Sequence, residues 1–188
     1  MSDHQKPIIA VFCGSKSGTD PQFMNDAGEL GQLLAQHGFD IVYGGASIGM
    51  MAAVANAAIS SGARVTGVIP EVLVAWERQH EGLSNLIITK DMHIRKKTMY
   101  DMCEAAIILP GGFGTLDELF EMLTWNQLSI HDKKIYILNT AGFYDYLMLH
   151  LESLEKKGFL YDPIWTRLKH FQQPLALVEA MQQDLEKI

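Results

Sequence analysis

The chain has few of the features that mark secreted, metal-binding or nucleic-acid-binding proteins. It contains 2 cysteines in 188 residues, too few for a disulfide framework at this length. Its 15 basic residues are outnumbered by 22 acidic ones, and a net charge of −7 argues against a nucleic-acid partner, because such binding begins with a basic face. The histidines lack metal-ligand spacing, so we expect no metal site.

Charge is also missing from the stretch Ile41–Ala63, which is long enough to raise the question of a membrane span. This stretch contains Gly44 and Gly45 directly after a short β-like run, so we interpret it as a strand, a loop and a buried helix. The first residues contain no apolar signal core. We therefore expect a cytoplasmic protein without a membrane partner.

Short apolar runs alternate with longer helical patterns along the chain. The runs predict strands at residues 8–13, 40–43, 64–69, 86–89, 105–109 and 135–138. Helices are predicted from Pro21 to about Gly38, at 48–61, 94–102, 115–128 and 143–157, and from about Pro174. This alternation is typical of a Rossmann-like α/β fold, a mostly parallel sheet with helices on both faces. At about 150 residues per domain, we expect residues 1–188 to form a single domain.

Three glycine-containing loops follow predicted strands, where ligands bind in open parallel sheets. The loop Pro110-Gly111-Gly112-Phe113-Gly114-Thr115 is the most informative. Its glycines bring backbone N–H groups close to an anion, and a helix beginning at Thr115 would point its positive end there. Thr115 can cap that helix or donate its hydroxyl to a phosphate. A tight turn with a helix cap is the structural alternative, but this concentration of glycines favours an anion site.

The other two loops are weaker signals. Residues 44–49 lack the G-x-G-x-x-G spacing, and the chain has no G-x-x-x-x-G-K-[ST] motif, which argues against ATP hydrolysis of the P-loop type. Residues 13–18 include Cys13, which together with Cys103 flanks a predicted strand and is interpreted as a core residue. With the 111–115 loop, the 44–49 loop predicts two backbone cradles for one phosphorylated ligand.

The charged residues predict chemistry at this place. Arg95, Lys96 and Lys97 lie at the start of a predicted helix, where the dipole disfavours positive charge; either this is a solvated helix end or it captures phosphate. Glu118 lies one turn into the predicted helix after the glycine loop, whereas Asp117 points about 100° away and is expected to face solvent. A carboxylate beside a bound anion is costly, which favours catalysis over binding alone. A carboxylate with a cation suits hydrolysis of a glycosidic bond in a sugar phosphate.

These motifs resemble those of the Lonely Guy family of cytokinin riboside 5′-monophosphate phosphoribohydrolases. The resemblance rests on Met92-His93-Ile94-Arg95-Lys96 and on residues 110–118, with support from Cys13-Gly14-Ser15, Tyr43-Gly44-Gly45 and residues 123–128. Family members have often been labelled lysine decarboxylases, an activity that would need a pyridoxal-phosphate lysine, and no feature here singles one out. Two positions depart from the family pattern: Ile94, where Glu or Gln is frequent, and Asp117, where Glu is frequent.

The resemblance implies hydrolysis of the N-glycosidic bond of adenosine 5′-monophosphates, often N6-prenylated, to the free base and ribose 5-phosphate. It also implies a homodimer without a metal or organic cofactor. Arg95 and Glu118 would be catalytic. The candidate substrate-binding and phosphate-binding residues are Ser15, Gly45, Glu77, Lys96, Gly111, Gly112, Gly114, Thr115 and Thr124.

Two other functions stay open at this point. One is a general nucleosidase acting on AMP or other purine nucleotides. The other is a non-catalytic carrier or sensor of a nucleotide or of molybdenum cofactor. The paired Arg95 and Glu118 argue against the carrier, because a protein that only binds an anion gains nothing from a carboxylate beside it.

Overall fold

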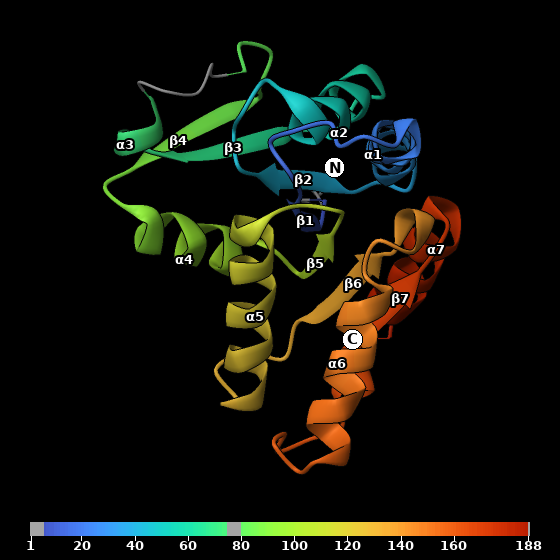
Figure 1. Ribbon diagram of the computed structural model, residues 1–188. Coiled ribbons are helices and arrows are strands. Elements are labelled where there is room, and N and C mark those ends of the chain that lie inside the picture. Colours follow the sequence, from blue (N-terminus) through green and yellow to red (C-terminus); the bar gives the residue numbers. More distant parts are fainter. Residues whose placement is uncertain (1–5, 75–79, 188) are drawn as a thin grey trace.

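The computed structural model describes residues 6–74 and 80–187, and within them one seven-stranded sheet forms the centre of the molecule (Figure 1). Its strand order is β4-β3-β2-β1-β5-β6-β7, and every neighbouring pair is parallel. The strands are β1 (Ile8–Phe12), β2 (Asp40–Tyr43), β3 (Val65–Pro70), β4 (Asn85–Thr89), β5 (Ala105–Ile108), β6 (Lys134–Leu138) and β7 (Leu168–Phe171). The predicted Rossmann-like α/β fold is confirmed.

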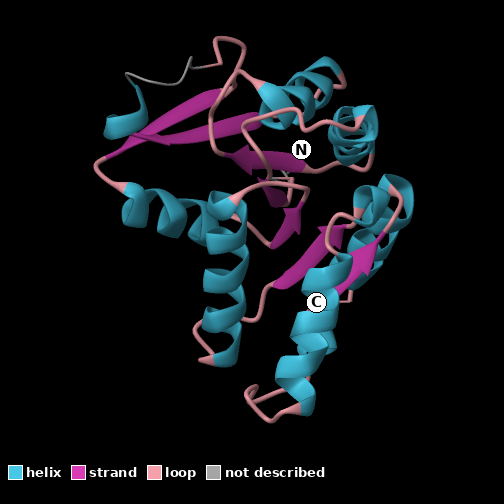
Figure 2. Cartoon of the chain, in the orientation of Figure 1, coloured by secondary structure: helices cyan, strands magenta, loops and turns pink. Residues whose placement is uncertain are grey.

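Helices cover both faces of this sheet (Figure 2). Side chains of α1 (Pro21–Gln36), α2 (Gly49–Ser60) and α7 (Pro174–Leu185) pack in the hydrophobic core of one face. Those of α4 (Met92–Met102), α5 (Phe113–Gln127) and α6 (Asp145–Lys156) pack in the core of the other. Three short helices complete the described chain: α3 (Glu71–Val74), η1 (Thr140–Gly142) and η2 (Ile164–Thr166). The continuous apolar strands are explained by this burial on both sides.

The uncharged stretch Ile41–Ala63 forms most of β2, the following loop and α2, as interpreted from its glycines. Within the part of the chain that the structure describes, none of the helices is both long enough and apolar enough to cross a membrane.

The structure corrects three details of the sequence prediction. β7 and α3 were not predicted, because each is only 4 residues long and β7 contains the polar residues Lys169 and His170. α4 begins at Met92, where the Asp91 carboxylate accepts a hydrogen bond from the Ile94 N–H at 2.8 Å, rather than near Ile94. α5 begins at Phe113 with Gly112 as its cap residue. Thr115 is therefore inside the first turn and does not cap the helix.

The strand order places a topological switch point between β1 and β5. From β1 the chain proceeds to β2 on one side, and it later returns to pair β5 on the other. The loops after two such strands diverge and leave a crevice, where ligands bind in open α/β sheets. The two loops are joined at their base, where the Gly14 N–H donates to the Pro110 carbonyl at 3.0 Å.

Candidate active site

A cavity of about 530 Å³ opens at this switch point. A volume of this size is typical of small-molecule sites. Its walls come from the loops after β1 and β5, from α4 and α5, and from α1, α2 and the segment after η1. The lining residues are Cys13, Gly14, Ser15, Lys16, Gly18, Phe23, Met50, Met51, Arg95, Pro110, Gly111, Gly112, Phe113, Gly114, Thr115, Glu118 and Phe143.

The first turn of α5 lies in one wall and has the form of an anion cradle. The first hydrogen bond of the helix runs from the Leu116 N–H to the Gly112 carbonyl, at 3.1 Å. The N–H groups of Phe113, Gly114 and Thr115 come before it. Such first-turn N–H groups have no partner within a helix, and the helix dipole adds positive potential. A Cβ at Gly111 would lie 2.1 Å from the Thr115 hydroxyl oxygen, so only glycine fits there. The early helix start therefore presents three donors to the cavity.

Arg95 is held by main-chain carbonyls on the strand side of α4. Its Nε donates to the Val68 carbonyl at 2.9 Å and its Nη2 to the Gly44 carbonyl at 3.3 Å. A Cβ at Gly44 would lie 2.3 Å from that Nη2, so the glycine makes room for the guanidinium. The third nitrogen, Nη1, is 3.8 Å from Oε1 of Glu118. The two hydrogen bonds to carbonyl groups orient Arg95 toward the cavity, although its side chain is only 8% exposed.

Glu118 is a buried carboxyl group in the same cavity. Burial raises its pKa from 4.5 to about 7; the positive charge of Arg95 opposes this rise, and the negative charge of Asp117 adds to it. A carboxyl with a pKa near neutrality exchanges protons readily at physiological pH, which is the property required of a general acid or base.

A comparison with known proteins identifies the family. Residues 51–181 match the profile of a family described as "Possible lysine decarboxylase". Among curated proteins, the chain is 43% identical over 152 residues to a probable cytokinin riboside 5′-monophosphate phosphoribohydrolase of Oryza sativa subsp. japonica, covering 81% of this chain and 68% of the relative. It is 42% identical over 152 residues to a cytokinin riboside 5′-monophosphate phosphoribohydrolase of Arabidopsis thaliana, covering 81% of this chain and 71% of that one. The chain belongs to the Lonely Guy family.

Some solved structures that resemble this chain are named for binding molybdenum cofactor rather than for hydrolysis. A Moco carrier protein from Chlamydomonas reinhardtii superposes with a TM-score of 0.74 at 22% identity, covering 98% of this chain and 100% of that one. A molybdenum cofactor binding protein from Rippkaea orientalis gives a TM-score of 0.73 at 22% identity, covering 97% and 99%. Identities this low show a shared fold alone.

The structure brings most of the predicted site residues together. The cavity is lined by both predicted catalytic residues, Arg95 and Glu118. It is also lined by the predicted binding residues Ser15, Gly111, Gly112, Gly114 and Thr115. Cys13, predicted as a core residue, is 5% exposed and contributes to the cavity wall.

Lys96 turns away from this cavity toward α5. Its Nζ lies 2.9 Å from Asp117 Oδ2 and 3.1 Å from Glu121 Oε2. Burial alone would lower the pKa of Lys96, but the hydrogen bonds and negative charges of these two carboxylates raise it. Asp117 is 58% exposed in its side chain, as its position on the helix predicted. Lys96 therefore joins α4 to α5 and does not line the cavity.

Three more predicted binding residues lie elsewhere. Gly45 has a φ of +82° and does not line the cavity; it packs on β3, where a Cβ added to it would lie 3.5 Å from the Cβ of Ile69. Thr124 lies in the last turns of α5 and donates its hydroxyl to the Phe120 carbonyl at 2.7 Å, beside a second groove. Glu77 lies outside the described residues.

Sequence reasoning missed the apolar wall of the cavity. Phe23, Met50, Met51 and Phe143 contribute to it. In the sequence, the first three have the periodic spacing of helical core residues, and that pattern does not distinguish a core contact from a cavity wall. No group of three or more His, Cys, Asp and Glu side chains among the described residues could hold a metal ion.

Proposed function

We propose that this protein hydrolyses the N-glycosidic bond of adenosine 5′-monophosphates, including N6-substituted ones, and releases the free base and ribose 5-phosphate. The observation that carries the proposal is the position of Glu118, a buried carboxyl with a pKa of about 7 in one cavity with the anion cradle of α5. The relatives named phosphoribohydrolases, at 43% and 42% identity, support the same reaction.

The geometry supports a proposed role for each part of the site. The 5′-phosphate binds the N–H groups at the start of α5, with the Thr115 hydroxyl as a further donor. The Glu118 carboxylate orients a water molecule and stabilises positive charge on the ribose. Arg95 opposes the rise in the Glu118 pKa and offers Nη1 to the bound anion.

The reaction balances without a further reactant. The water oxygen bonds to C1′ of the ribose while the bond from C1′ to the base nitrogen breaks, and its electron pair leaves with the base. One water proton passes to Glu118 and from there to the base. Glu118 returns to its starting state, as a catalyst must.

The alternative of a carrier or sensor is less well supported. A bound phosphate would raise the cost of an ionised carboxyl in the same cavity, so a protein that only binds would be better served by a neutral residue at position 118. The polar residues of the cavity do not discriminate between AMP and N6-substituted AMP, because in this arrangement they surround the phosphate and the ribose rather than the base.

The direct test is to incubate the purified protein with AMP or with isopentenyladenosine 5′-monophosphate and to follow base and ribose 5-phosphate by chromatography. We expect equal amounts of both products, and Glu118→Gln should lower kcat at least 100-fold, the range typical of a lost general acid or base. Glu29→Gln, an exposed carboxyl on α1, is the matched control and should retain full activity.

Two results would contradict the proposal. Turnover of Glu118→Gln within a few-fold of the wild type would show that the carboxyl is not catalytic. Nucleotide binding without release of base from either substrate would point to the carrier or sensor.

Three broader predictions stand beside the reaction. We propose a homodimer, supported by exposed apolar side chains on α5, directly after it and on α6: Phe120, Leu128, Tyr146 and Leu149. We also propose that residues 1–188 act as a single domain and that the protein works in the cytoplasm, as the sequence predicts.

A further inference from the structure

The active-site cavity has two chemically different sides. One side carries the N–H groups of α5, Arg95 and Glu118, which suit a phosphate and a ribose. The other side is apolar and consists of Met50 and Met51 from α2, Phe23 from α1, and Phe143 from the segment after η1. The two sides meet at Gly44, where a Cβ would lie 2.3 Å from Arg95 Nη2 and 3.0 Å from Met51 Sδ. With the phosphate at the start of α5 and C1′ beside Glu118, the base is directed to the apolar side.

Two aromatic rings stand together in the apolar side. The rings of Phe23 and Phe143 meet edge to face, with centroids 5.7 Å apart and planes at 82°. Such pairs have a defined geometry because the positive ring edge meets the negative ring face. A Cβ at Gly18 would lie 2.4 Å from Cδ2 of Phe23, so the loop after β1 lies directly against that ring.

Phe143 is also tied to the sheet. Its ring packs edge to face on Tyr144 at 4.8 Å, and the Tyr144 hydroxyl donates to the Leu109 carbonyl at 2.8 Å, at the end of β5. Even so, Phe143 is 44% exposed. A ring held in place on one side and left open on the other has the form of a ligand contact rather than of a core residue.

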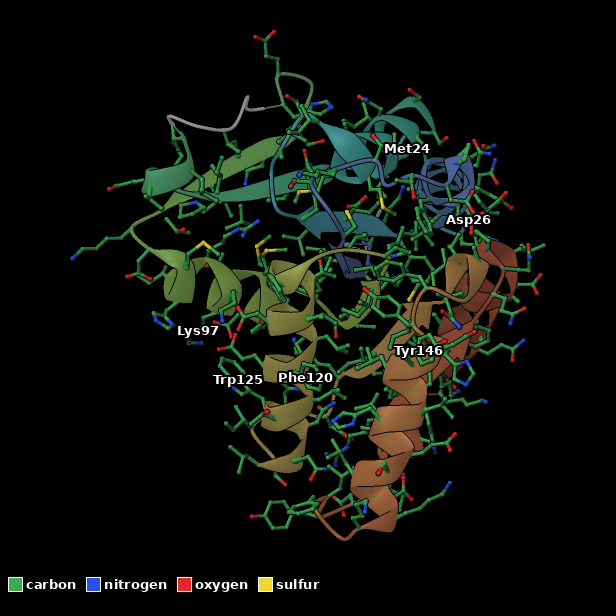
Figure 3. All side chains as sticks on the ribbon, in the orientation of Figure 1. Met24, Asp26, Lys97, Phe120, Trp125 and Tyr146 are labelled. Carbon is green, nitrogen blue, oxygen red and sulfur yellow. The ribbon has the colours of Figure 1, made fainter. Side chains whose placement is uncertain are left out.

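A buried hydrogen bond joins the two segments that carry these rings. Asp26 on α1, labelled in Figure 3, is 3% exposed, and Thr140 in η1 is 1% exposed. The Thr140 hydroxyl donates to Asp26 Oδ2 at 2.6 Å, and the Gln22 amide donates to the other carboxylate oxygen at 2.5 Å. Asp26 follows Phe23 by one helical turn, and the Phe143 N–H donates to the Thr140 carbonyl at 3.1 Å. The bond therefore fixes the spacing between the two rings.

We propose that Phe23 and Phe143 are specificity-determining residues that contact the departing base and an apolar substituent on it, and that the Asp26–Thr140 hydrogen bond is the positioning contact that seats them. This inference rests on the proposed function for the orientation of the nucleotide. Aromatic rings bind bases through stacking, because every base has a π-face, and an apolar substituent that contacts the same rings adds buried apolar area.

The first test replaces each ring by leucine. Phe23→Leu and Phe143→Leu should raise KM about fivefold to tenfold while kcat changes less than twofold, because the lost contact is made equally in the ground and transition states. The increase should be larger for isopentenyladenosine 5′-monophosphate than for AMP. Phe159→Leu, at an aromatic residue 74% exposed beside the second groove, is the matched control and should leave both KM values unchanged.

The second test loosens the positioning contact without touching the cavity. Thr140→Val removes the hydroxyl and should raise KM in the same substrate order as the ring variants, whereas Thr140→Ser keeps the donor and should restore the wild-type ratio. A loss of stability alone would lower the amount of active protein and leave the ratio of the two KM values where it was. Circular dichroism melting curves establish that each variant is folded at the assay temperature.

The outcomes separate this inference from the proposed function. An active wild type whose KM ratio is unchanged in both ring variants would overturn the inference and leave the hydrolase intact. Should the wild type release no base, calorimetric affinities for AMP replace the kinetics, and equal affinities of wild type and ring variants would overturn the inference. Weaker AMP binding by the ring variants would support it even then.

Discussion

At the scale of single residues, the protonation of Glu118 governs what the site can do. Its pKa of about 7 leaves the carboxyl about half ionised at neutral pH. If the carboxylate is the active form, kcat/KM should rise with pH and level off above about 7, because this ratio reports the ionisation of free enzyme and free substrate. Initial rates at low substrate concentration between pH 5.5 and 8.5 measure the profile.

The substrate phosphate also titrates, with a pKa near 6, so the profile needs a control that changes only the enzyme. The negative charge of Asp117 raises the Glu118 pKa. Asp117→Asn should therefore move the inflection of the kcat/KM profile to lower pH, while the pKa of the substrate phosphate stays unchanged. A profile that is flat, or that Asp117→Asn leaves unmoved, would remove Glu118 from the pH dependence.

The same carboxyl has a cost in stability. A raised pKa means that the folded chain binds this proton more tightly than the unfolded chain, so stability falls as pH rises from about 4.5 to about 7. Glu118→Gln removes that penalty. We expect the variant to be more stable than the wild type at pH 8 by roughly 3 kcal/mol, since each tenfold change in proton affinity corresponds to about 1.4 kcal/mol, and much less so at pH 5.

Urea unfolding of both proteins at the two pH values measures this difference. Glu29→Gln on the exposed face of α1 is the reference and should give the same small difference at pH 5 and pH 8. If the gain in unfolding free energy of Glu118→Gln does not grow with pH, the fold does not raise the pKa of this carboxyl. The predicted gain in stability would accompany a loss of activity, a trade-off often found at active sites.

At the scale of helices and strands, the sequence predicts which elements exist better than where they begin. The helix after the glycine loop was predicted from its apolar spacing, but glycines lower helix propensity, so Phe113 and Gly114 were assigned to the loop. In the structure they belong to the first turn of α5. The strand β7 was missed because its 4 residues include Lys169 and His170 and so form no continuous apolar run.

Helix geometry also explains why Lys96 does not act with Arg95. Neighbouring residues on a helix point about 100° apart, the same rule that correctly predicted an exposed Asp117. On α4 this rotation directs Arg95 toward the carbonyls of β3 and of the loop after β2, and Lys96 toward α5. Two neighbouring basic residues of the sequence thus lie in different places, Arg95 in the candidate active-site cavity and Lys96 in a contact between helices.

At the scale of the whole molecule, the cavity shows what sequence reasoning could not supply. The glycine loop and Glu118 lie within one short segment, and their proximity follows from one helix end. The apolar wall combines Phe23, Met50 and Phe143, which lie on separate elements and meet only through the packing of α1, α2 and η1. Local patterns predict the polar half of this site, and tertiary structure is needed for the other half.

The outer surface leads to the last prediction. A groove of about 290 Å³ between α5 and α6 is lined largely by apolar residues, among them Phe120 and Leu128 (38% and 58% exposed). Tyr146 and Leu149 of α6 are 86% and 61% exposed, and Figure 3 labels Phe120 and Tyr146 on the two helices. Exposed apolar surface of this kind marks a protein interface, and the proposed homodimer would cover it.

Sedimentation analysis at micromolar concentration tests this assembly, and we expect a species with twice the mass of one chain. Phe120→Glu and Leu149→Glu should shift it toward the single-chain mass, because each would bury an unpaired charge in an apolar interface. Lys157→Glu, an exposed charge reversal after the end of α6, is the control and should leave the dimer intact. A wild type that sediments as one chain, or glutamate variants that stay dimeric, would show that α5 and α6 do not form the interface.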